Sequence, residues 1–333
     1  MRAQLLTEPA PVASRPLELC DCPEPEPAER EIRVRIEACG VCRTDLHLVE
    51  GDIAAGKLPV VPGHQIVGTV EQTGLAARQF QLGDRVGVAW LRGTCGRCEA
   101  CERGDENLCV GSEYTGSHAD GGYAESCVVD EAYAYPLDDR LSAFETTPLL
   151  CAGIIGYRAL ERAHVPRAGR VGLFGFGSSA SLVARLALHR GHSVYAFSRG
   201  EARLDEARRI GAEWAGGTED RAPELLDSAI VFAPSGKVVL PALRSIRPGG
   251  HVVLAGIHLS DVPEIDYERH LFHEKTLTSV EANTRSDGKA FLDEALAAGI
   301  APRVQTFPLE QANEALAGLS AGTLTGSPVL DCR

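Results

Sequence analysis

The strongest chemical signal in this sequence is a cluster of cysteines in one short stretch. Four of them follow a C-x2-C-x2-C-x7-C pattern: Cys95, Cys98, Cys101 and Cys109. Glycines at positions 96 and 104 supply tight turns that let four thiolates converge on one point. Four sulfur ligands complete a tetrahedral zinc site and leave no position for a substrate. The spacing therefore predicts a structural zinc loop at about residues 92–110, in preference to four free thiols.

Composition bears on whether such cysteines form disulfides or bind metal. The chain has 333 residues and eleven cysteines, and it shows neither a signal segment nor an apolar run of about 20 residues. We therefore expect a soluble cytoplasmic protein, and in a reducing compartment tight cysteine clusters favour metal binding. The net charge of −13, with acidic and basic residues interleaved, predicts neither nucleic-acid nor membrane partners.

A glycine-rich turn indicates dinucleotide binding. The segment GFGSSA fits the G-x-G-x-x-G/A pattern, and Gly175 and Gly177 would let backbone amides approach a pyrophosphate. After the next strand, where NAD enzymes usually present an acidic residue to the ribose, this chain has Ser198 and Arg199. An arginine without a carboxylate suits a 2′-phosphate, so NADP is favoured over NAD. The alternative is that Arg199 is merely a surface residue. In that case the assigned end of the strand would be wrong, and nearby Glu201 would be the residue at the ribose position.

The order of predicted elements indicates an α/β fold with two domains. The N-terminal half contains short strands with period-two alternation, such as residues 31–36. From residue 170 onward, apolar strands alternate with helices, which is typical of a doubly wound parallel sheet covered on both faces. Two helical stretches and a short strand near the C-terminus break this alternation, and we expect them to pack back on the first domain.

Two shorter motifs carry side chains suited to metal binding and proton transfer. CGVCRTDLH places a thiol, a hydroxyl, a carboxylate and an imidazole within six positions, from Cys42 to His47. PGHQIVG places His64 between a Pro-Gly turn and a strand. Taken singly, each motif also has a plain structural interpretation, Cys42 as a small buried side chain and His64 as a hydrogen-bonded core histidine.

Together with the four-cysteine loop and the glycine motif, these segments resemble the zinc-dependent alcohol dehydrogenases of the medium-chain dehydrogenase/reductase family. The resemblance extends over essentially the whole chain. It implies a GroES-like β-rich catalytic domain at residues 1–152, a Rossmann dinucleotide-binding domain at 153–284, and a return to the catalytic domain at 285–333. It also implies a homo-oligomer, either a dimer or a tetramer.

The resemblance implies an oxidoreductase that transfers a hydride between a primary alcohol or aldehyde and NAD(P). Its catalytic zinc would be held by Cys42, His64 and Cys151, the last lying in LLCAGIIGYRAL. Three protein ligands leave the fourth position open to water or substrate, as a catalytic zinc requires. With the four-cysteine loop, two zinc ions per chain are expected.

Neighbouring residues take further roles by the same resemblance. Thr44 would be the hydrogen-bond relay and His47 the terminal general base for the departing proton. Asp45 would hydrogen-bond the zinc ligand His64 and fix its tautomer. Arg43 resembles the family's pyrophosphate contact, with a merely exposed arginine as the alternative.

Three positions bear on how this chain differs from its relatives. Gln65 follows His64 where the family usually has Glu, which removes a negative charge and predicts that bound water or alcohol loses its proton at lower pH. Ser327 stands where many relatives have an arginine, so one pyrophosphate contact is expected to be missing. Trp90 stands where enzymes with narrow pockets present an aromatic ring, which favours small primary alcohols unless Trp90 is a packing residue.

Two alternatives remain open at this level. The chain could be a polyol dehydrogenase or an aromatic-aldehyde reductase of the same family, which only substrate profiling separates. It could also be a non-catalytic protein that binds zinc or a dinucleotide. Thr44 and His47 count against the second alternative, because a sensor needs no proton relay.

Overall fold

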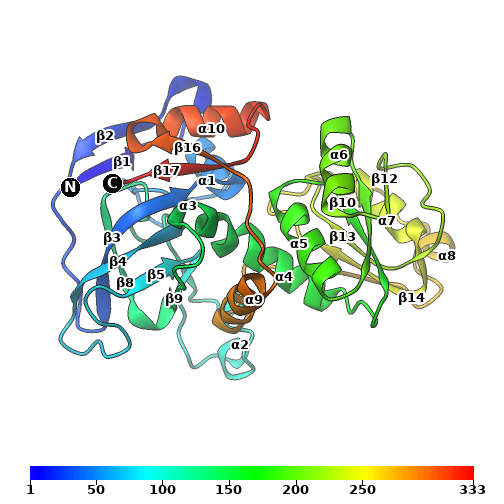
Figure 1. Cartoon of the computed structure of the whole chain (residues 1–333), viewed down its shortest axis with the longest axis horizontal. Helices are drawn as coiled ribbons and strands as arrows, with labels where there is room; N and C mark the ends of the chain where they lie inside the picture. The colour runs from blue at the N-terminus through cyan, green and yellow to red at the C-terminus, as the bar shows by residue number, and fades with distance from the viewer. The chain divides into compact units, whose positions relative to one another are not determined.

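The computed structural model describes residues 1–333, and its contacts divide the chain into two units (Figure 1). Unit 1 contains Met1–Cys151, Thr284–Lys289 and Ala301–Arg333. Unit 2 contains Ala152–Asn283 and Ala290–Ile300. The chain therefore leaves unit 1 directly after Cys151 and comes back to it near the C-terminus.

Unit 1 is built mainly from β-strands. Its strands are β1 (Arg2–Leu6), β2 (Leu17–Asp21), β3 (Glu31–Gly40), β4 (Gln65–Thr73), β5 (Arg85–Val88), β6 (Leu91–Gly93), β7 (Glu113–Tyr114), β8 (Ser126–Asp130), β9 (Ala134–Pro136), β16 (Val304–Pro308) and β17 (Ser327–Asp331). Seven of them form one sheet in the order β16-β17-β3-β4-β5-β9, with β8 paired to β3. The hairpins β1-β2 and β6-β7 stand as separate two-stranded sheets.

Short helices connect the strands of unit 1. The α-helices are α1 (Arg43–Glu50), α2 (Glu99–Glu102), α3 (Ala143–Thr146) and α10 (Ala312–Ala321). The 3-10 helices are η1 (Val12–Ser14), η2 (Glu106–Leu108), η3 (Glu131–Tyr133), η4 (Thr147–Leu150) and η6 (Leu309–Gln311). The core follows the alternation of β3, in which Ile32, Val34 and Ile36 are buried while the residues between them are more exposed.

Unit 2 is a six-stranded parallel sheet with helices. Its strands are β10 (Arg170–Phe174), β11 (Ser193–Phe197), β12 (Trp214–Gly216), β13 (Leu226–Val231), β14 (Ile246–Leu254) and β15 (Thr276–Ser279). Its helices are α4 (Ala152–Arg162), α5 (Ser178–His189), α6 (Glu201–Ile210), η5 (Gly236–Val238), α7 (Val239–Ser245) and α8 (Tyr267–His270). The order β12-β11-β10-β13-β14-β15, with every pair parallel, confirms the predicted doubly wound sheet.

The boundary near the C-terminus differs from the expected one. Within the predicted return, residues 285–333, the stretch Ala290–Ile300 belongs to unit 2, although helix α9 spans Arg285–Ala297. Phe291 is buried there, and Glu294 forms an ion pair of 2.7 Å with Arg190. These contacts draw most of α9 to unit 2, a preference that its amphipathic sequence does not reveal.

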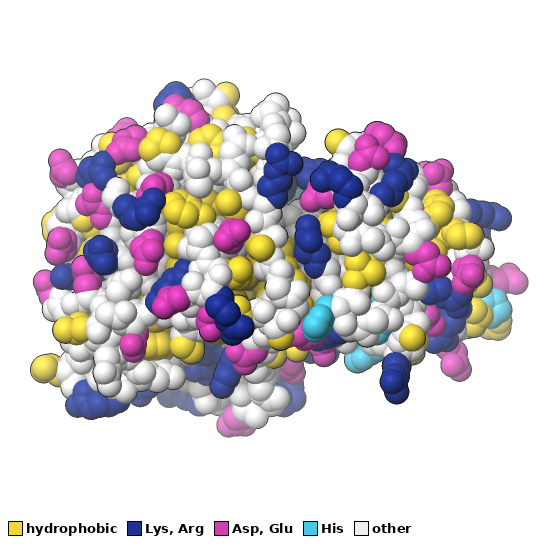
Figure 2. All heavy atoms as spheres, viewed as in Figure 1, with side chains coloured by type: hydrophobic (Ala, Val, Ile, Leu, Met, Phe, Trp, Pro, Cys, Tyr) yellow, Lys and Arg dark blue, Asp and Glu magenta, His cyan; other side chains and the backbone are white.

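The helices and the surface bear on possible partners. No helix combines the length and the apolar character needed to cross a lipid bilayer. On the face shown in Figure 2, acidic and basic side chains are interspersed and do not gather in separate regions. This distribution agrees with the interleaved charges read from the sequence.

Candidate metal and cofactor sites

The first cluster of metal-ligating side chains begins at the junction of β3 and α1. Cys42 is the N-cap of α1, and its Sγ accepts a hydrogen bond of 3.3 Å from the Thr44 backbone N–H. In return, Asp45 Oδ2 accepts a hydrogen bond of 2.8 Å from the Cys42 N–H. This reciprocal capping fixes the sulfur at the positive end of the helix dipole, which stabilises a thiolate.

Two further ligand-type atoms lie beside Cys42. Its Sγ is 3.5 Å from His64 Nε2 and 4.0 Å from Cys151 Sγ, and all three ligand atoms lie within 4.8 Å of one another. His64 directly precedes β4, and Cys151 follows the helix η4. Zinc takes sulfur at about 2.3 Å and imidazole nitrogen at about 2.0 Å, so ligands of one ion are separated by distances of this size. Two thiols and one imidazole are also a donor set that zinc prefers, so these residues fit the ion.

Asp45 orients the imidazole of this cluster. Its Oδ1 lies 2.9 Å from His64 Nδ1, and both side chains are buried, with exposed fractions of 2% and 1%. When Nδ1 carries the proton and donates it to Asp45, the lone pair of Nε2 points at the sulfurs. Such a carboxylate partner fixes the tautomer of a metal-binding histidine and makes it a better donor.

Burial and mutual contact shift the pKa values in this cluster. Burial acts to lower the pKa of His64, but the negative charges of Asp45 and Cys42 outweigh it and raise this pKa to about 10. The hydrogen bond from Cys151 holds the pKa of Cys42 well below that of an ordinary thiol, and the same bond, together with burial, raises the pKa of Cys151. Burial also raises the pKa of Asp45. A divalent cation would offset this concentration of buried negative charge.

The residues expected to move the proton lie along α1. Thr44 is buried one turn before His47, whose side chain is 14% exposed. His47 Nδ1 lies 2.8 Å from Asp52 Oδ2, a contact that the sequence did not predict. Arg43, at the first position of the helix, is exposed. The helix thus carries a buried hydroxyl and, one turn later, an imidazole with its own carboxylate partner, starting from Cys42 of the first cluster.

Trp90 lies directly beside His64 of the first cluster. The two ring centroids are 4.9 Å apart and the ring planes meet at 72°, an edge-to-face arrangement. Trp90 also stacks on Tyr114, with centroids 4.8 Å apart and planes at 13°. The structure therefore places Trp90 beside the cluster, and it adds Tyr114, which sequence reasoning missed.

Gln65 is buried close to the same cluster and only partly hydrogen-bonded. Its side chain lies over Gly40, where a Cβ atom would come within 2.7 Å of Gln65 Oε1. Gln65 is 3% exposed, and its Nε2 has no hydrogen-bond partner. The amide that replaces the family's usual carboxylate is thus a buried neutral group next to His64. Ser327, by contrast, begins β17 and is partly exposed.

The second cluster is the four-cysteine loop between β6 and β7. The four Sγ atoms lie within 4.8 Å of one another, and those of Cys98 and Cys101 are 3.5 Å apart. Cys109 Sγ accepts backbone hydrogen bonds of 3.3 Å from Cys95 and Gly111. The expected turns at positions 96 and 104 have φ values of 68° and 83°, a conformation that favours glycine. Four converging thiols and backbone N–H donors fit a closed zinc site.

The pKa values of the loop thiols are split in the same way as in the first cluster. A hydrogen bond from the Arg97 backbone and one from Cys109 lower the pKa of Cys95 to about 6. Burial and the neighbouring Cys98 raise the pKa of Cys101 to about 11. The four thiols therefore share their protons within one compact group. A bound cation would replace these protons.

An ion pair anchors this loop to a distant segment of unit 1. Glu106 accepts hydrogen bonds from the Arg285 backbone N at 2.7 Å, from Nε at 3.0 Å and from Nη2 at 2.6 Å. The Arg285 guanidinium also lies over the ring of Tyr133 at 4.5 Å. Sequence reasoning missed this pair, because nothing in the local pattern links positions 106 and 285.

The glycine-rich turn of unit 2 lies where β10 ends and α5 begins. Gly175 has φ of 91°, and a Cβ there would lie 2.6 Å from the backbone nitrogen of Ala233. Gly177 is the N-cap of α5, no side chain caps this end, and a Cβ at Gly177 would meet nothing within 4 Å. The N–H groups of the first turn are therefore accessible to an anionic group such as a pyrophosphate.

The residues that directly follow β11 are Ser198 and Arg199. Ser198 is buried and its N–H donates to the Gly216 carbonyl at 2.9 Å, whereas Arg199 is exposed. Glu201, the other candidate for a ribose contact, begins α6 and accepts a hydrogen bond of 2.5 Å from Arg208. The first acidic side chain after β11 in the sequence is thus engaged within its own helix.

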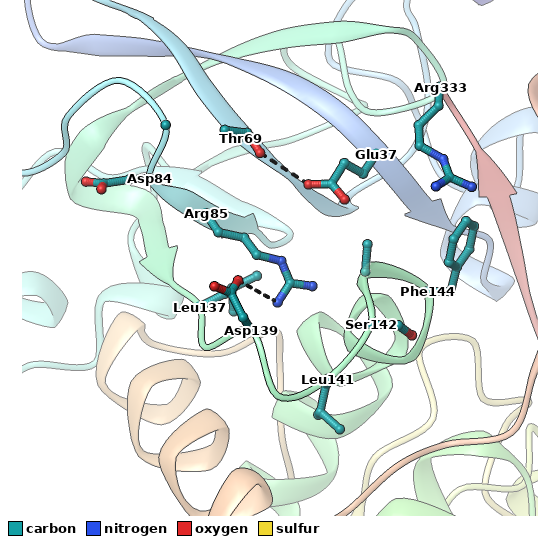
Figure 3. Close-up of a pocket in the computed structure, with 12 residues that line it drawn as sticks. Glu37, Thr69, Asp84, Arg85, Leu137, Asp139, Leu141, Ser142, Phe144 and Arg333 are labelled. Carbon is teal, nitrogen blue, oxygen red and sulfur yellow. Dashed lines mark hydrogen bonds and ion pairs between the residues drawn. The ribbon is translucent and has the colours of Figure 1, made fainter.

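A separate pocket of about 630 Å³ opens on unit 1 (Figure 3). Its charged lining groups are already paired, since Glu37 accepts a hydrogen bond of 3.2 Å from Thr69 and Arg85 lies 3.6 Å from Asp139. None of its lining residues belongs to either cysteine cluster. We assign this pocket no part in the chemistry.

Both parts of the chain match known protein families. Residues 28–139 match the family described as "Alcohol dehydrogenase GroES-like domain", and residues 180–297 match "Zinc-binding dehydrogenase". A probable alcohol dehydrogenase, AdhA, of Mycobacterium tuberculosis is 48% identical over 335 residues, covering 99% of this chain and 97% of the relative. An alcohol dehydrogenase of Geobacillus stearothermophilus is 33% identical over 325 residues, covering 95% and 96%.

Solved structures share the fold over the whole chain. A thermostable alcohol dehydrogenase from Pyrobaculum aerophilum, with cobalt and zinc bound, has a TM-score of 0.90 at 24% identity and covers 99% of both chains. A cinnamyl alcohol dehydrogenase from Sorghum bicolor also has a TM-score of 0.90 at 24% identity, covering 99% of this chain and 97% of that one. The chain therefore belongs to the zinc-dependent alcohol dehydrogenases of the medium-chain dehydrogenase/reductase family, and it is an oxidoreductase that acts on alcohols.

Proposed function

We propose that this enzyme holds two zinc ions per chain and uses one of them to interconvert small primary alcohols and aldehydes with NADP. The catalytic ion would be bound by Cys42, His64 and Cys151, and the structural ion by the four-cysteine loop. The observation that carries the proposal is the convergence of Cys42 Sγ with His64 Nε2 at 3.5 Å and Cys151 Sγ at 4.0 Å. Three ligands leave a fourth position for substrate, whereas four sulfurs leave none.

The reaction removes a hydride and a proton from the alcohol and leaves an aldehyde. Zinc, when bound, supplies a Lewis acid that makes the alcohol more acidic or polarises the aldehyde carbonyl. Asp45 holds His64 in the tautomer that binds metal. Thr44 passes the alcohol proton along α1 towards His47, and the Asp52 carboxylate at Nδ1 makes Nε2 the nitrogen that takes it up. The nicotinamide, when bound, would accept the hydride, so one alcohol and one NADP⁺ would give one aldehyde, one NADPH and one proton.

Metal analysis tests the zinc assignment directly. Purified protein is expected to contain two zinc equivalents per chain, and the variant H64A is expected to contain one and to lose turnover. A matched control is H189A, because His189 is exposed, lies in unit 2 and belongs to neither cluster. Full zinc content and full turnover in H64A would contradict the assignment.

The position of Trp90 supports small substrates. Its ring borders His64, so it occupies space beside the metal ligands that a bulky aldehyde would need. We expect W90A to raise kcat/KM for benzaldehyde relative to acetaldehyde. An unchanged ratio would show that Trp90 is a packing residue, and it would leave an aromatic-aldehyde or polyol substrate as the better assignment.

The end of β11 supports NADP. Arg199 is exposed there and Glu201 is engaged with Arg208, so Arg199 is the cation that a 2′-phosphate would meet. Initial rates of butanal reduction should show a higher kcat/KM with NADPH than with NADH, and R199A should remove the difference. A preference for NADH would overturn the cofactor assignment without affecting the zinc assignment.

The setting of the enzyme is part of the same proposal. We infer that it works in the reducing cytoplasm, because all eleven cysteines are unpaired and two clusters of them are suited to metal. We also propose a homo-oligomer, a dimer or a tetramer. Light scattering on the zinc-loaded enzyme would test the oligomer, and a monomer mass would contradict it.

A further inference from the structure

A continuous series of aromatic rings leads away from the catalytic metal ligands. His64 contacts Trp90 edge-to-face, Trp90 stacks on Tyr114 with near-parallel planes, and Tyr114 meets His118 with centroids 5.5 Å apart. Trp90 and Tyr114 are both partly exposed. Because solvent covers part of the indole, the two rings that contact it, His64 and Tyr114, have a large share in fixing its position.

Backbone contacts place Tyr114 opposite Trp90. Leu91 of β6 pairs with Tyr114 of β7, and the Thr115 N–H donates to the Trp90 carbonyl at 2.8 Å. The Tyr114 hydroxyl accepts a hydrogen bond of 2.8 Å from Ser112 Oγ. The tyrosine ring is thus held both by the hairpin and by its own hydroxyl.

The same hairpin carries the four-cysteine loop. β6 ends at Gly93, two residues before the first cysteine, and β7 begins at Glu113, four residues after the last. A loop closed on itself by four thiols fixes the distance between the two strands, and with it the pairing of Trp90 and Tyr114. The four-cysteine loop takes no part in the reaction, but through this hairpin it helps to fix the position of Trp90 beside His64.

We propose that Tyr114 is a positioning residue that sets the substrate size limit by holding the Trp90 indole against the metal site. This inference rests on the proposed role of Trp90 in the substrate pocket. An indole that stacks on Tyr114 and also contacts His64 edge-to-face keeps one orientation. Without the tyrosine ring it reaches other rotamers, and the space beside the metal ligands widens for branched and aromatic aldehydes. Tyr114 itself touches no reacting atom.

Substrate selectivity provides the first test. We expect Y114L to raise the ratio of kcat/KM for benzaldehyde over acetaldehyde by about three- to tenfold, in the same direction as W90A, because an aromatic pair is worth up to about a factor of ten. Y114F keeps the ring and loses only the bond to Ser112, so it should keep the wild-type ratio. An unchanged ratio in Y114L, with a changed one in W90A, overturns the role of Tyr114.

Tryptophan fluorescence provides a second test that does not depend on turnover. The chain has two tryptophans, so the variant W214F leaves Trp90 as the only one. In that background Y114L should raise the acrylamide quenching constant of Trp90 by about two- to threefold, because the indole loses the ring that shields one face, whereas Y114F should leave it unchanged. Equal quenching in Y114L and the wild-type background overturns the positioning role.

The two tests separate this inference from the proposed function. If W90A leaves the substrate ratio unchanged, the pocket role of Trp90 is wrong, and the size limit assigned to Tyr114 falls with it. If W90A changes the ratio and Y114L changes neither the ratio nor the quenching, the proposed function stands and only the role of Tyr114 is overturned.

Discussion

The two cysteine clusters of unit 1 solve the same coordination problem in opposite ways. The ligands of the four-cysteine loop lie within 14 positions of one another, whereas Cys42 and Cys151 are 109 positions apart. The first cluster needs a strand end, a helix N-terminus and a long connection to bring its atoms together. The second needs only two glycine turns. Because the fold of the whole domain brings the three side chains of the first cluster together, this cluster does not depend on a metal for its shape. It can therefore offer three protein ligands and leave a fourth coordination position open.

The clusters also differ in burial, although less sharply. In the first cluster Cys42 and Cys151 are half-buried and His64 is 1% exposed, whereas the loop runs from the exposed Cys95 to the buried Cys109. A dry site strengthens the action of a metal on a substrate, since charges interact more strongly away from water. A loop with few apolar contacts gains more from a metal as a structural bond. We therefore expect substitutions in the first cluster to affect turnover, and those in the second to affect stability.

The largest effect is expected from C42S. Serine can still cap α1 through the Thr44 N–H, so folding should be preserved, but the hydroxyl is a poor zinc ligand. Turnover of butanal should fall by at least about 10³-fold, since a Lewis acid is worth several kcal/mol in such a reaction. Zinc analysis should show one equivalent lost.

The control for C42S is C22S, which changes a thiol outside both clusters. It should keep turnover and zinc content unchanged. A C42S protein that unfolds at much lower temperature than C22S would mean that the first cluster is also a structural bond, against the division of roles argued above.

The next largest effect is expected from C98S in the loop. Losing one of four ligands should destabilise unit 1 by about 3 kcal/mol or more, which lowers its Tm by about 6–12 °C. At 20–25 °C the folded fraction should still reduce acetaldehyde within about threefold of the wild-type rate, because no loop thiol meets the substrate. Thermal unfolding followed by circular dichroism, with turnover measured per folded molecule, checks both parts. Loss of turnover without loss of stability would reverse the assignment.

A smaller effect is expected from D45N. Asparagine keeps the size of the side chain but removes the charge that holds the His64 N–H. Replacing the carboxylate partner of a metal-binding histidine typically costs about 10- to 100-fold in metal affinity or activity. Zinc release to a coloured chelator should therefore become faster for one of the two ions only. D293N, at an exposed carboxylate of unit 2, should leave both ions in place.

The contrast between the clusters also explains which features the sequence can predict. The four-cysteine loop and the turn at Gly175 are local, so spacing alone indicates their chemistry. The set Cys42, His64 and Cys151 carries no spacing rule and was reached through family resemblance. The pairs that sequence reasoning missed, His47 with Asp52 and Glu106 with Arg285, depend on which way a loop turns or on contacts across 179 positions. Such contacts follow from the packed fold, which composition and periodicity do not specify.

The smallest effect is expected from R285A, which tests whether the loop depends on protein contacts as well as on metal. Burial acts to raise the pKa of Glu106, but the hydrogen bonds and charge of Arg285 outweigh it and lower this pKa below its usual value of 4.5. A carboxylate with a lowered pKa stabilises the fold above its unfolded pKa and loses that contribution as the pH falls through its folded pKa.

At pH of about 7 the variant R285A should lose about 1–2 kcal/mol of stability, and the loss is small because the guanidinium is partly exposed. As the pH falls through the lowered pKa of Glu106, the stability difference between variant and wild type should shrink, because Glu106 takes up a proton in both. R285K keeps the positive charge but not the paired N–H groups, so its stability should lie between that of R285A and that of the wild-type enzyme. Equal stability of R285A and the wild-type enzyme at neutral pH would mean that the cysteine loop is held by its metal alone.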